Sequence, residues 1–306
     1  MKLQDLYVLM AVVQAGSMRR AAARLNTTQP SISRSIADLE RTIGVQLLDR
    51  TPLGVEPTAY GRALLDGGAA MFDDLRQAVK NIEFLADPTA GQTRIGSNPF
   101  LASGFVATVV DRLSRRYPRM AFQIVAEPAE SLSRRLSDRS LDLLITRGFG
   151  PIADECFEFE VLFDDSSLFV AASAQSPWAR RRRIELAELM NELWVLPPPD
   201  GGTGVLAMAA FRARGLPYPP ATVIADNAQV RMTLVATGRF LTIFPVSVLT
   251  FTAMRLLKVL PIELPAGHMS VGLVTLKNRM LNPVARMFIE HAREVARPLA
   301  KQRASK

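Results

Sequence analysis

A short polar segment, Thr28 to Arg34, carries side chains that can recognise DNA bases. Glutamine can pair bidentately with adenine and arginine with guanine, whereas threonine and proline offer apolar contact to the methyl group of thymine. The segment also stands at the predicted start of a helix, where backbone N–H groups suit a phosphate oxygen. The residues predicted to contact DNA here are Thr28, Gln29, Pro30, Ser31, Ser33 and Arg34.

The charge around this segment favours a polyanionic partner. The chain has a formal net charge of +8, but much of the excess lies in its C-terminal half, so the total does not identify a partner. The local distribution is more informative, because no acidic residue occurs between Asp5 and Asp38 while Arg19, Arg20 and Arg24 lie inside that window. Such a positive surface suits phosphates. The alternative is an ordinary helical hairpin with an exposed polar turn.

Three short helices and a hairpin are predicted to position the polar segment. Apolar spacing predicts a first helix from Leu3 that ends at Gly16, and a second helix that is capped by the side chain of Ser17. Thr28 caps a third helix, which carries the polar segment in its first turns. The stretch Val45–Val55 then reads as two short strands around a Pro/Gly turn.

A long amphipathic helix is predicted to follow from Thr58 to about Leu85. A helix of that length at a domain edge most often packs against a copy of itself. The break Asp87–Gly91 gives the domain boundary, so the expected organisation is 1–57, a linker helix 58–86 and a C-terminal domain 92–306. In that last part strands alternate with helices, which predicts a mostly parallel sheet with helices on both faces.

Polar residues at the ends of the predicted strands indicate a small-molecule site. In open α/β sheets, ligands bind beyond the carboxyl ends of the strands. Such donors suit an anionic or polar ligand, although each residue alone could simply cap a helix or form a turn. Arg147 could clamp a carboxylate or form a surface salt bridge. The candidate residues are Ser97, Asn98, Phe100, Thr146, Arg147, Thr203, Asn227 and Phe244.

Several other functions find little support. The stretch Gly202–Ala207 has the form G-x-G-x-x-A, but Pro197–Pro199 separates it from its strand, which disfavours dinucleotide binding. The sequence lacks common hydrolase, P-loop and zinc-protease motifs, and His268, His291 and the single Cys156 make neither a metal site nor an internal disulfide. We expect no enzyme, no metal and no cofactor. Without an export signal or a membrane span, we expect a cytoplasmic protein.

The N-terminal residues closely resemble the LysR-type transcriptional regulators. Met18 stands where that family usually has phenylalanine, and the match is looser beyond residue 65. The segments that carry the resemblance are Met18–Leu25, Thr28–Arg34, Ile36, Leu39–Glu40, Leu47–Arg50 and Thr58–Gly61.

The resemblance implies a fold, a function and partners. The fold would be α/β, with an N-terminal all-α winged helix-turn-helix domain and a C-terminal two-lobed domain like the periplasmic binding proteins (lobe I, 92–161 and 267–306; lobe II, 162–266). The protein would be a sequence-specific transcriptional regulator on the bacterial nucleoid. Its reading helix would be Thr28–Arg34 and its wing Arg50–Thr51. A small effector between the lobes would modulate it.

The resemblance also implies a homodimer, and usually a tetramer, with double-stranded DNA and the effector as partners and RNA polymerase as a further candidate. Two alternatives remain. A solute-binding receptor would need only residues 92–306, and a metabolic enzyme could carry the helical N-terminal module.

Overall fold

The computed structural model describes residues 1–51, 54–148, 156–251, 256–265, 267 and 269–301. Its contacts divide the chain into two compact units, Met1–Val79 and Lys80–Lys306. This division lies inside the long helix and not at the expected break Asp87–Gly91. The reason is that the earlier turns of the helix pack with the N-terminal residues, whereas its last turns belong to the second unit.

Three helices form the core of the first unit. They are α1 (Leu3–Ala15), α2 (Met18–Arg24) and α3 (Gln29–Ile43). Gly16 (φ 61°) and Gly44 (φ 85°) end α1 and α3 in the left-handed conformation that glycine adopts without a steric penalty. Thr28 caps α3 as predicted, but the Ser17 side chain makes no capping hydrogen bond to α2.

A two-stranded wing follows α3. Strands β1 (Leu48–Thr51) and β2 (Gly54–Pro57) pair antiparallel. The carboxylate of Glu40 accepts a hydrogen bond from the backbone N–H of Leu47 at 2.8 Å and so ties the entry of the wing to α3. The N–H of Val55 donates to the carbonyl of Gly16 at 3.1 Å. The wing is therefore held against the helices at two points, while the predicted turn residues 52 and 53 lie outside the described residues.

Helix α4 (Ala59–Ala86) is the long linker helix. The Thr58 hydroxyl caps it by accepting from the N–H of Gly61 at 3.0 Å, and it donates to the carbonyl of Gln46 at 2.8 Å. Further along, the rings of Phe72 and Tyr7 meet edge to face with centroids 5.9 Å apart. These contacts join the earlier turns of α4 to the three-helix core.

Two glycines of α4 should respond in opposite ways to alanine. A Cβ on Gly61 would lie 2.1 Å from the carbonyl oxygen of Leu47, whereas a Cβ on Gly67 would meet nothing within 4 Å. Gly61→Ala should therefore destabilise the first unit by about 1–3 kcal/mol, and Gly67→Ala should stabilise it by up to about 1 kcal/mol.

Calorimetric unfolding of the full chain can measure both changes. Trp178 and Trp194, the two tryptophans of the chain, lie in the second unit. The transition without a change in tryptophan fluorescence therefore belongs to the first unit. If both variants moved that transition in the same direction, the close approach of Gly61 to Leu47 would be wrong.

The second unit begins with a five-stranded sheet in the order β4-β3-β5-β12-β6. Strand β3 is parallel to β4 and to β5, but β12 runs antiparallel to both β5 and β6. The expectation of a mostly parallel sheet is therefore wrong. The chain leaves this lobe after β6 and returns along β12, and these outgoing and returning strands pair side by side. The strands are β3 (Ala90–Ser97), β4 (Arg119–Ala126), β5 (Leu143–Arg147), β6 (Phe157–Asp164) and β12 (Ser270–Leu276).

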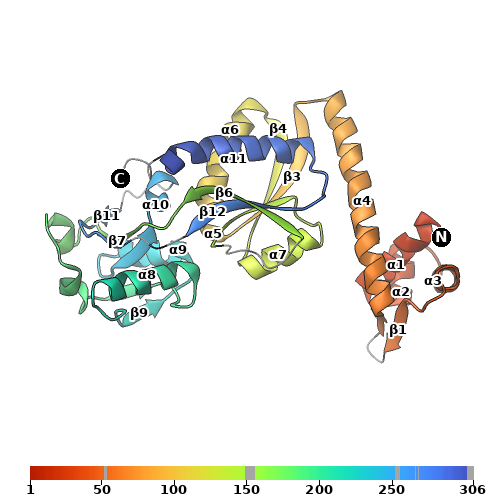
Figure 1. Ribbon diagram of the computed structural model, residues 1–306, viewed down its shortest axis with the longest axis horizontal. Helices are drawn as coiled ribbons and strands as arrows, with labels where there is room; N and C mark the ends of the chain where they lie inside the picture. The colour runs from red at the N-terminus through yellow and green to blue at the C-terminus, as the bar shows by residue number, and fades with distance from the viewer. Residues whose placement is uncertain (52–53, 149–155, 252–255, 266, 268, 302–306) are drawn as a thin grey trace. The chain divides into compact units, whose positions relative to one another are not determined.

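Helices cover both faces of this sheet, as predicted. Helices α6 (Ala107–Arg116) and α11 (Pro283–Lys301) lie on one face and α7 (Ala129–Ser137) on the other (Figure 1). A short helix α5 (Pro99–Leu101) and a π-helical turn, Ala102–Val106, lead from β3 into α6. Side chains that alternate along the strands supply the two cores, with Ile145 facing α6 and α11 and Leu144 facing α7.

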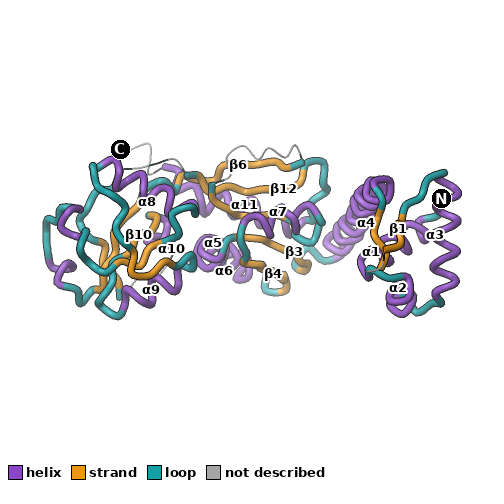
Figure 2. Tube along the Cα trace, turned by 90° about the horizontal axis from the view of Figure 1, so that it is seen from below, coloured by secondary structure: helices purple, strands orange, loops and turns teal. Residues whose placement is uncertain are grey.

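The second lobe is built on shorter strands. Because β6 still pairs with β12 at Asp164, the crossover falls slightly later than the expected boundary at 161/162. Helix α8 packs on one face of the sheet and α9 on the other (Figure 2). Strand β7 (Leu168–Ser173) pairs antiparallel with β10 (Thr242–Pro245) and β11 (Leu257–Val259), and β8 (Trp194–Leu196) pairs parallel with β9 (Ala221–Ile224). The helices are α8 (Gly202–Ala213), α9 (Ala228–Ala236) and α10 (Ser247–Phe251), with 3-10 turns at Pro177–Arg180 and Leu186–Leu189.

A buried carboxylate joins three segments of the first lobe. Asp142 is 1% exposed and precedes β5. It accepts from the Arg94 guanidinium on β3 at 2.8 Å and from Arg279, which follows β12, at 3.2 Å. Burial raises the pKa of Asp142, but the hydrogen bonds and charge of Arg94 outweigh burial and hold the pKa below its usual value.

Candidate nucleic-acid interface and effector site

The first turns of α3 lie on the surface. Ile32, Ile36 and Leu39 are buried and attach the helix to the three-helix core. The opposite face carries the predicted contact residues: Thr28, Gln29, Pro30, Ser31 and Arg34 are exposed, and Ser33 is half-buried. The sequence therefore folds so that the polar segment is presented outward by a helix whose other face is anchored.

Two of these side chains have local structural tasks. The Thr28 hydroxyl accepts from the N–H of Ser31 at 3.4 Å, and the two hydroxyl groups lie 3.0 Å apart. Both hydroxyls therefore help to form the start of α3. Gln29 and Arg34 have the longer side chains and extend further from the helix axis, so they are the strongest candidates for contact with base edges.

The neighbouring charges leave a positive surface beside α3. Arg19 and Arg20 on α2 are exposed, and Arg24 donates to the side chain of Gln14 at 3.3 Å. The nearest acid after the arginine-rich window, Asp38, is paired with Arg41 at 2.8 Å. The distribution predicted from the sequence thus becomes a continuous cationic region over α2 and the start of α3, which suits a phosphate backbone.

The wing residues predicted to contact DNA both lie in β1. Arg50 pairs with Val55 in the backbone register, and the described contacts do not include its side chain. Thr51 is half-buried and pairs with Gly54 at the tip of the described hairpin. The wing thus offers a short backbone edge and one described side chain next to the helical module.

In the first lobe, Ser97 and Thr146 end neighbouring parallel strands, as predicted. Ser97 is fully buried and donates to the carbonyl of Ile145 at 2.8 Å, and Thr146 is 2% exposed. Asn98 is half-buried and caps α5 by accepting from the N–H of Leu101 at 2.9 Å. The structure brings these three residues together at one end of the sheet, with Ser97 and Asn98 already engaged by the backbone.

Arg147 forms a buried ion pair across the two lobes. Its Nε donates to the carboxylate of Asp165 at 2.7 Å and its Nη2 donates to the hydroxyl of Ser247 on α10 at 3.0 Å. The guanidinium lies 4.5 Å from the centre of the Phe100 ring, a cation–π contact. Of the two expectations for Arg147, neither a free clamp nor a surface salt bridge describes this arrangement.

Burial is the largest influence on both members of this pair. It raises the pKa of Asp165 and lowers the pKa of Arg147, while the opposite charge of each partner and the hydrogen bonds of Ser247 oppose these shifts. Asp165 also accepts from the backbone N–H of Ser247 at 3.2 Å. The pair therefore connects the end of β5 to the start of α10 and holds the facing ends of the two lobes together.

The second-lobe candidates occupy different environments. Thr203 is half-buried in the first turn of α8, and Asn227 is exposed and caps α9 by accepting from the N–H of Gln229 at 2.8 Å. Phe244 is fully buried beside Phe169 and belongs to the core of the lobe, with Phe100 packed against the same cluster. Phe244 is therefore a core residue whose ring supports the site from below.

Arg231 is a functional candidate that sequence reasoning missed. It is 4% exposed, and its Nη1 donates to the carbonyls of Ala225 and Asp226 at 2.7 and 2.8 Å, at the carboxyl end of β9. Burial, reinforced by the charge of Arg147, lowers its pKa to about 10, against the opposing charge of Asp226. A single arginine on an amphipathic helix carries no signal of burial, so only the tertiary structure reveals it.

Side chains with other chemistry are scattered. Cys156 is exposed, and His291 on α11 is half-buried with its Nδ1 2.9 Å from the carbonyl of Met287. His268 lies outside the described residues. Across the described residues there is no group of three histidine, cysteine, aspartate or glutamate side chains that could hold a metal ion. Within the same residues, no helix has the length and apolar character needed to cross a membrane.

Two family models match this chain and together cover both units. The model of the bacterial regulatory helix-turn-helix proteins of the LysR family matches residues 3–62. The model of the LysR substrate binding domain matches residues 86–297. Both matches agree with the resemblance seen in the N-terminal motifs.

Full-length relatives and structures support the same assignment. The chain is 26% identical over 287 residues to the transcriptional regulator GbpR of Azospirillum brasilense (94% of this chain, 84% of the relative). It is 27% identical over 292 residues to the transcriptional dual regulator GltC of Bacillus subtilis (95% of this chain, 96% of the relative).

The fold is similar to that of solved regulators. A full-length OxyR variant from Pseudomonas aeruginosa has a TM-score of 0.65 at 21% identity (98% of this chain, 96% of that chain). Full-length CbnR in complex with its target DNA has a TM-score of 0.55 at 20% identity (97% of this chain, 100% of that chain). With two family models over most of its length, this chain belongs to the LysR family of transcriptional regulators.

Proposed function

We propose that this regulator reads promoter DNA with the first turns of α3 and contacts the backbone with its wing. The observation that carries the proposal is the exposed tip of α3, with Gln29 and Arg34 projecting from a helix whose opposite face is buried. A helix-turn-helix of this kind places its second helix in the major groove. The exposed arginines Arg19 and Arg20 supply phosphate contacts beside it. The proposed DNA contacts are Thr28, Gln29, Pro30, Ser31, Ser33, Arg34, Arg50 and Thr51.

We further propose that α4 pairs two copies of the chain. One face of α4 leaves large apolar side chains exposed at alternating intervals of about three and four residues, the spacing of a helix–helix seam. They are Met71, Leu75, Val79, Ile82 and Leu85; we call them the α4 stripe. The two reading helices of such a dimer would contact half-sites about one DNA turn apart, or a multiple of it. Two dimers would make the tetramer that the family resemblance implies.

The proposed effector is a small molecule bound where the lobes meet. The supporting observation is the Arg147–Asp165–Ser247 network, which links both lobes next to Ser97 and Thr146. A ligand that contacts both lobes can shift the protein between two arrangements only through its different affinity for each. We propose no cofactor, and RNA polymerase is the candidate partner of the DNA-bound state. The proposed effector contacts are Ser97, Asn98, Phe100, Thr146, Arg147, Thr203, Asn227 and Phe244, to which Arg231 is added.

We place the activity of the chain in binding and not in catalysis. Full-length relatives such as GltC are transcriptional regulators, and the sequence lacks the common catalytic motifs. A protein that binds promoter DNA acts where that DNA lies, so we propose association with the bacterial nucleoid in the cytoplasm. The receptor and enzyme alternatives give no role to the exposed tip of α3.

DNA binding can be tested with the reading helix alone changed. Gln29→Ala and Arg34→Ala should each weaken binding to the DNA upstream of the protein's own gene by about 1–3 kcal/mol, or roughly 5- to 150-fold, because each removes a predicted base contact. Fluorescence anisotropy at fixed salt measures the change. Arg41→Ala is the matched control, because Arg41 lies in the last turn of the same helix and pairs with Asp38. Parent-like affinity of both α3 variants would show that another element reads the DNA.

A further inference from the structure

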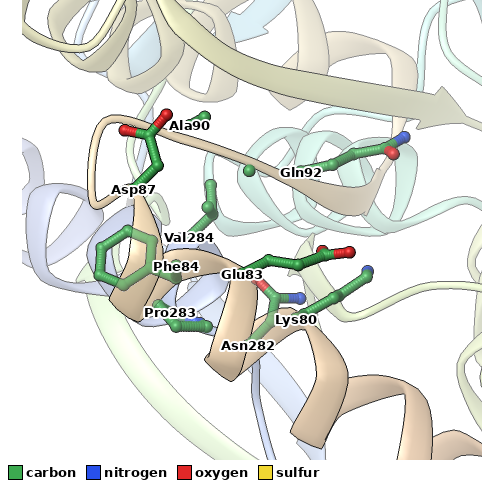
Figure 3. Close-up of a pocket in the computed structure, with 10 residues that line it drawn as sticks. Lys80, Glu83, Phe84, Asp87, Ala90, Gln92, Asn282, Pro283 and Val284 are labelled. Atoms are coloured by element: carbon green, nitrogen blue, oxygen red, sulfur yellow. The ribbon is translucent and has the colours of Figure 1, made fainter.

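A cavity lies at the junction of three elements of the second unit. It has a volume of about 380 Å³, within the range of small-molecule sites. Its walls come from the last turns of α4, the start of β3 and the beginning of α11 (Figure 3). The lining residues are Lys80, Glu83, Phe84, Asp87, Ala90, Gly91, Gln92, Asn282, Pro283 and Val284. None of them belongs to the proposed DNA or effector contacts.

Asn282 gives this cavity a buried hydrogen-bond donor. Its Oδ1 caps α11 by accepting from the N–H of Ala285 at 2.9 Å, which fixes the orientation of the carboxamide because the cap requires an oxygen. The other end of the group, Nδ2, is fully buried and has no hydrogen-bond partner among the described residues. Asn282 itself is 1% exposed. Since buried polar groups are almost always hydrogen-bonded, this donor calls for an acceptor in the cavity.

The charges around Asn282 favour a negatively charged acceptor. The cavity contains the N-terminus of α11, a 19-residue helix with the positive end of its dipole at this point. Lys80 lies on the same side of the cavity as the Asn282 carboxamide (Figure 3), and its charge lowers the pKa of nearby Asp142. Of the two acids, Asp87 is already bonded to Thr89 and Arg119, and Glu83 is exposed to water, which screens its charge.

The remaining walls are apolar. Phe84 and Val284 lie opposite the polar side of the cavity, with Ala90 and Pro283 beside them (Figure 3). From this arrangement we infer that the cavity is a second ligand site, which binds a small organic acid with its carboxylate at Asn282 Nδ2, the α11 N-terminus and Lys80, and its apolar body against Phe84 and Val284. The site is separate from the Arg147–Asp165–Ser247 network and does not depend on the DNA-binding proposal.

Three probes of one shape test the charge preference. They are 3-methylbutanoate, 3-methylbutanamide and 3-methylbutylamine, titrated into the full chain by calorimetry and followed by thermal shift. The acid should bind at least tenfold more tightly than the amide, and the amine more weakly still. An amine that binds more tightly than the acid would overturn the assignment, and so would the absence of any binding.

Asn282→Asp separates the site from the rest of the protein. Aspartate is as good a helix cap as asparagine, so the variant should keep the melting temperature of the parent, but it replaces the Nδ2 donor by a negatively charged acceptor. Its affinity for 3-methylbutanoate should fall at least tenfold while that for 3-methylbutylamine rises. Gln175→Glu makes the same change at an exposed position of the second lobe and should alter neither affinity.

Ala90→Leu fills the cavity without changing its polar groups. It should also reduce 3-methylbutanoate binding at least tenfold, because Ala90 lines the apolar side. Unchanged affinity in both Asn282→Asp and Ala90→Leu would show that the acid binds elsewhere and would refute the site. DNA affinity measured on the same variants reports separately on the proposed regulatory function.

Discussion

Leu75→Glu and Ile82→Glu, singly and together, are expected to turn the dimer into monomers. Leu75 is 59% exposed and Ile82 is 66% exposed, an unusual state for large apolar side chains at a regular helical interval. A second copy of α4 would cover them, and a glutamate inside that seam would have to lose its hydration without a partner. Sedimentation equilibrium measures the dimer dissociation constant directly.

The same variants should lose most of their affinity for an operator with two half-sites. Linking two reading helices makes the second contact intramolecular, and such avidity typically raises affinity about 100-fold or more. We therefore expect a loss of at least about 100-fold on the full operator. Binding to DNA with a single half-site should stay close to that of the parent, because the α3 residues are unchanged.

Ile224→Glu is the matched control for both measurements. Ile224 ends β9 in the second lobe and is 61% exposed, close to the exposure of Ile82. The control introduces the same side chain in place of the same residue, away from the α4 stripe, and should remain dimeric. If Leu75→Glu and Ile82→Glu stayed dimeric like this control, another surface would hold the dimer together.

Local chemistry made the N-terminal module predictable from the sequence. Gly16 and Gly44 end helices because their left-handed conformation is easiest for glycine, and Thr28 and Thr58 begin helices by accepting nearby N–H groups. Each of these signals acts over a few residues, so a linear reading can detect it. The family resemblance rested on this same region and is confirmed by the two family models.

Long-range pairing was the part that the sequence did not reveal. The direction of β12 depends on its place beside β5 and β6, more than a hundred residues earlier, and nothing in its own pattern distinguishes a parallel from an antiparallel neighbour. The Ser17 side chain also illustrates a limit, because the residue type suits a cap but the backbone geometry of this structure leaves the bond unmade.

The candidate effector site was predicted in position more than in detail. Ser97 and Thr146 do end neighbouring strands, since the carboxyl ends of parallel strands meet at one edge of a sheet. The partners of Arg147, by contrast, come from Asp165 and Ser247, which are distant in sequence and lie in the other lobe or at its entrance. Burial of Arg231 and Phe244 likewise depends on the packing of α9 on its sheet.

Asp142→Asn is expected to have the largest effect on the stability of the second unit. The substitution keeps the shape of the side chain but removes the charge that faces Arg94 and Arg279. The Arg279 side chain is fully buried, so its guanidinium would be left without a neutralising carboxylate. Breaking a buried pair in this way costs about 3–5 kcal/mol. Urea unfolding followed by tryptophan fluorescence isolates the unit, because Trp178 and Trp194 both belong to it.

Asp111→Asn provides a control with the same change of side chain. Asp111 pairs with Arg115 on the surface of α6, where the two side chains are 58% and 78% exposed. An exposed pair of this kind is expected to contribute less than about 1 kcal/mol. Equal losses in the two variants would show that the buried cluster has no special weight in stability.

The pH dependence gives a second, independent signature of the same cluster. The pKa of Asp142 is lower in the folded protein than its usual value, so below about pH 4 the unfolded chain binds the proton more readily than the folded one. The contribution of Asp142 is therefore complete near neutral pH and is lost as the pH falls through the lowered pKa. The stability difference between parent and Asp142→Asn should be largest at pH 7 and should shrink below about pH 4. A difference that stayed constant with pH would mean that the substitution acts through packing and not through the charge.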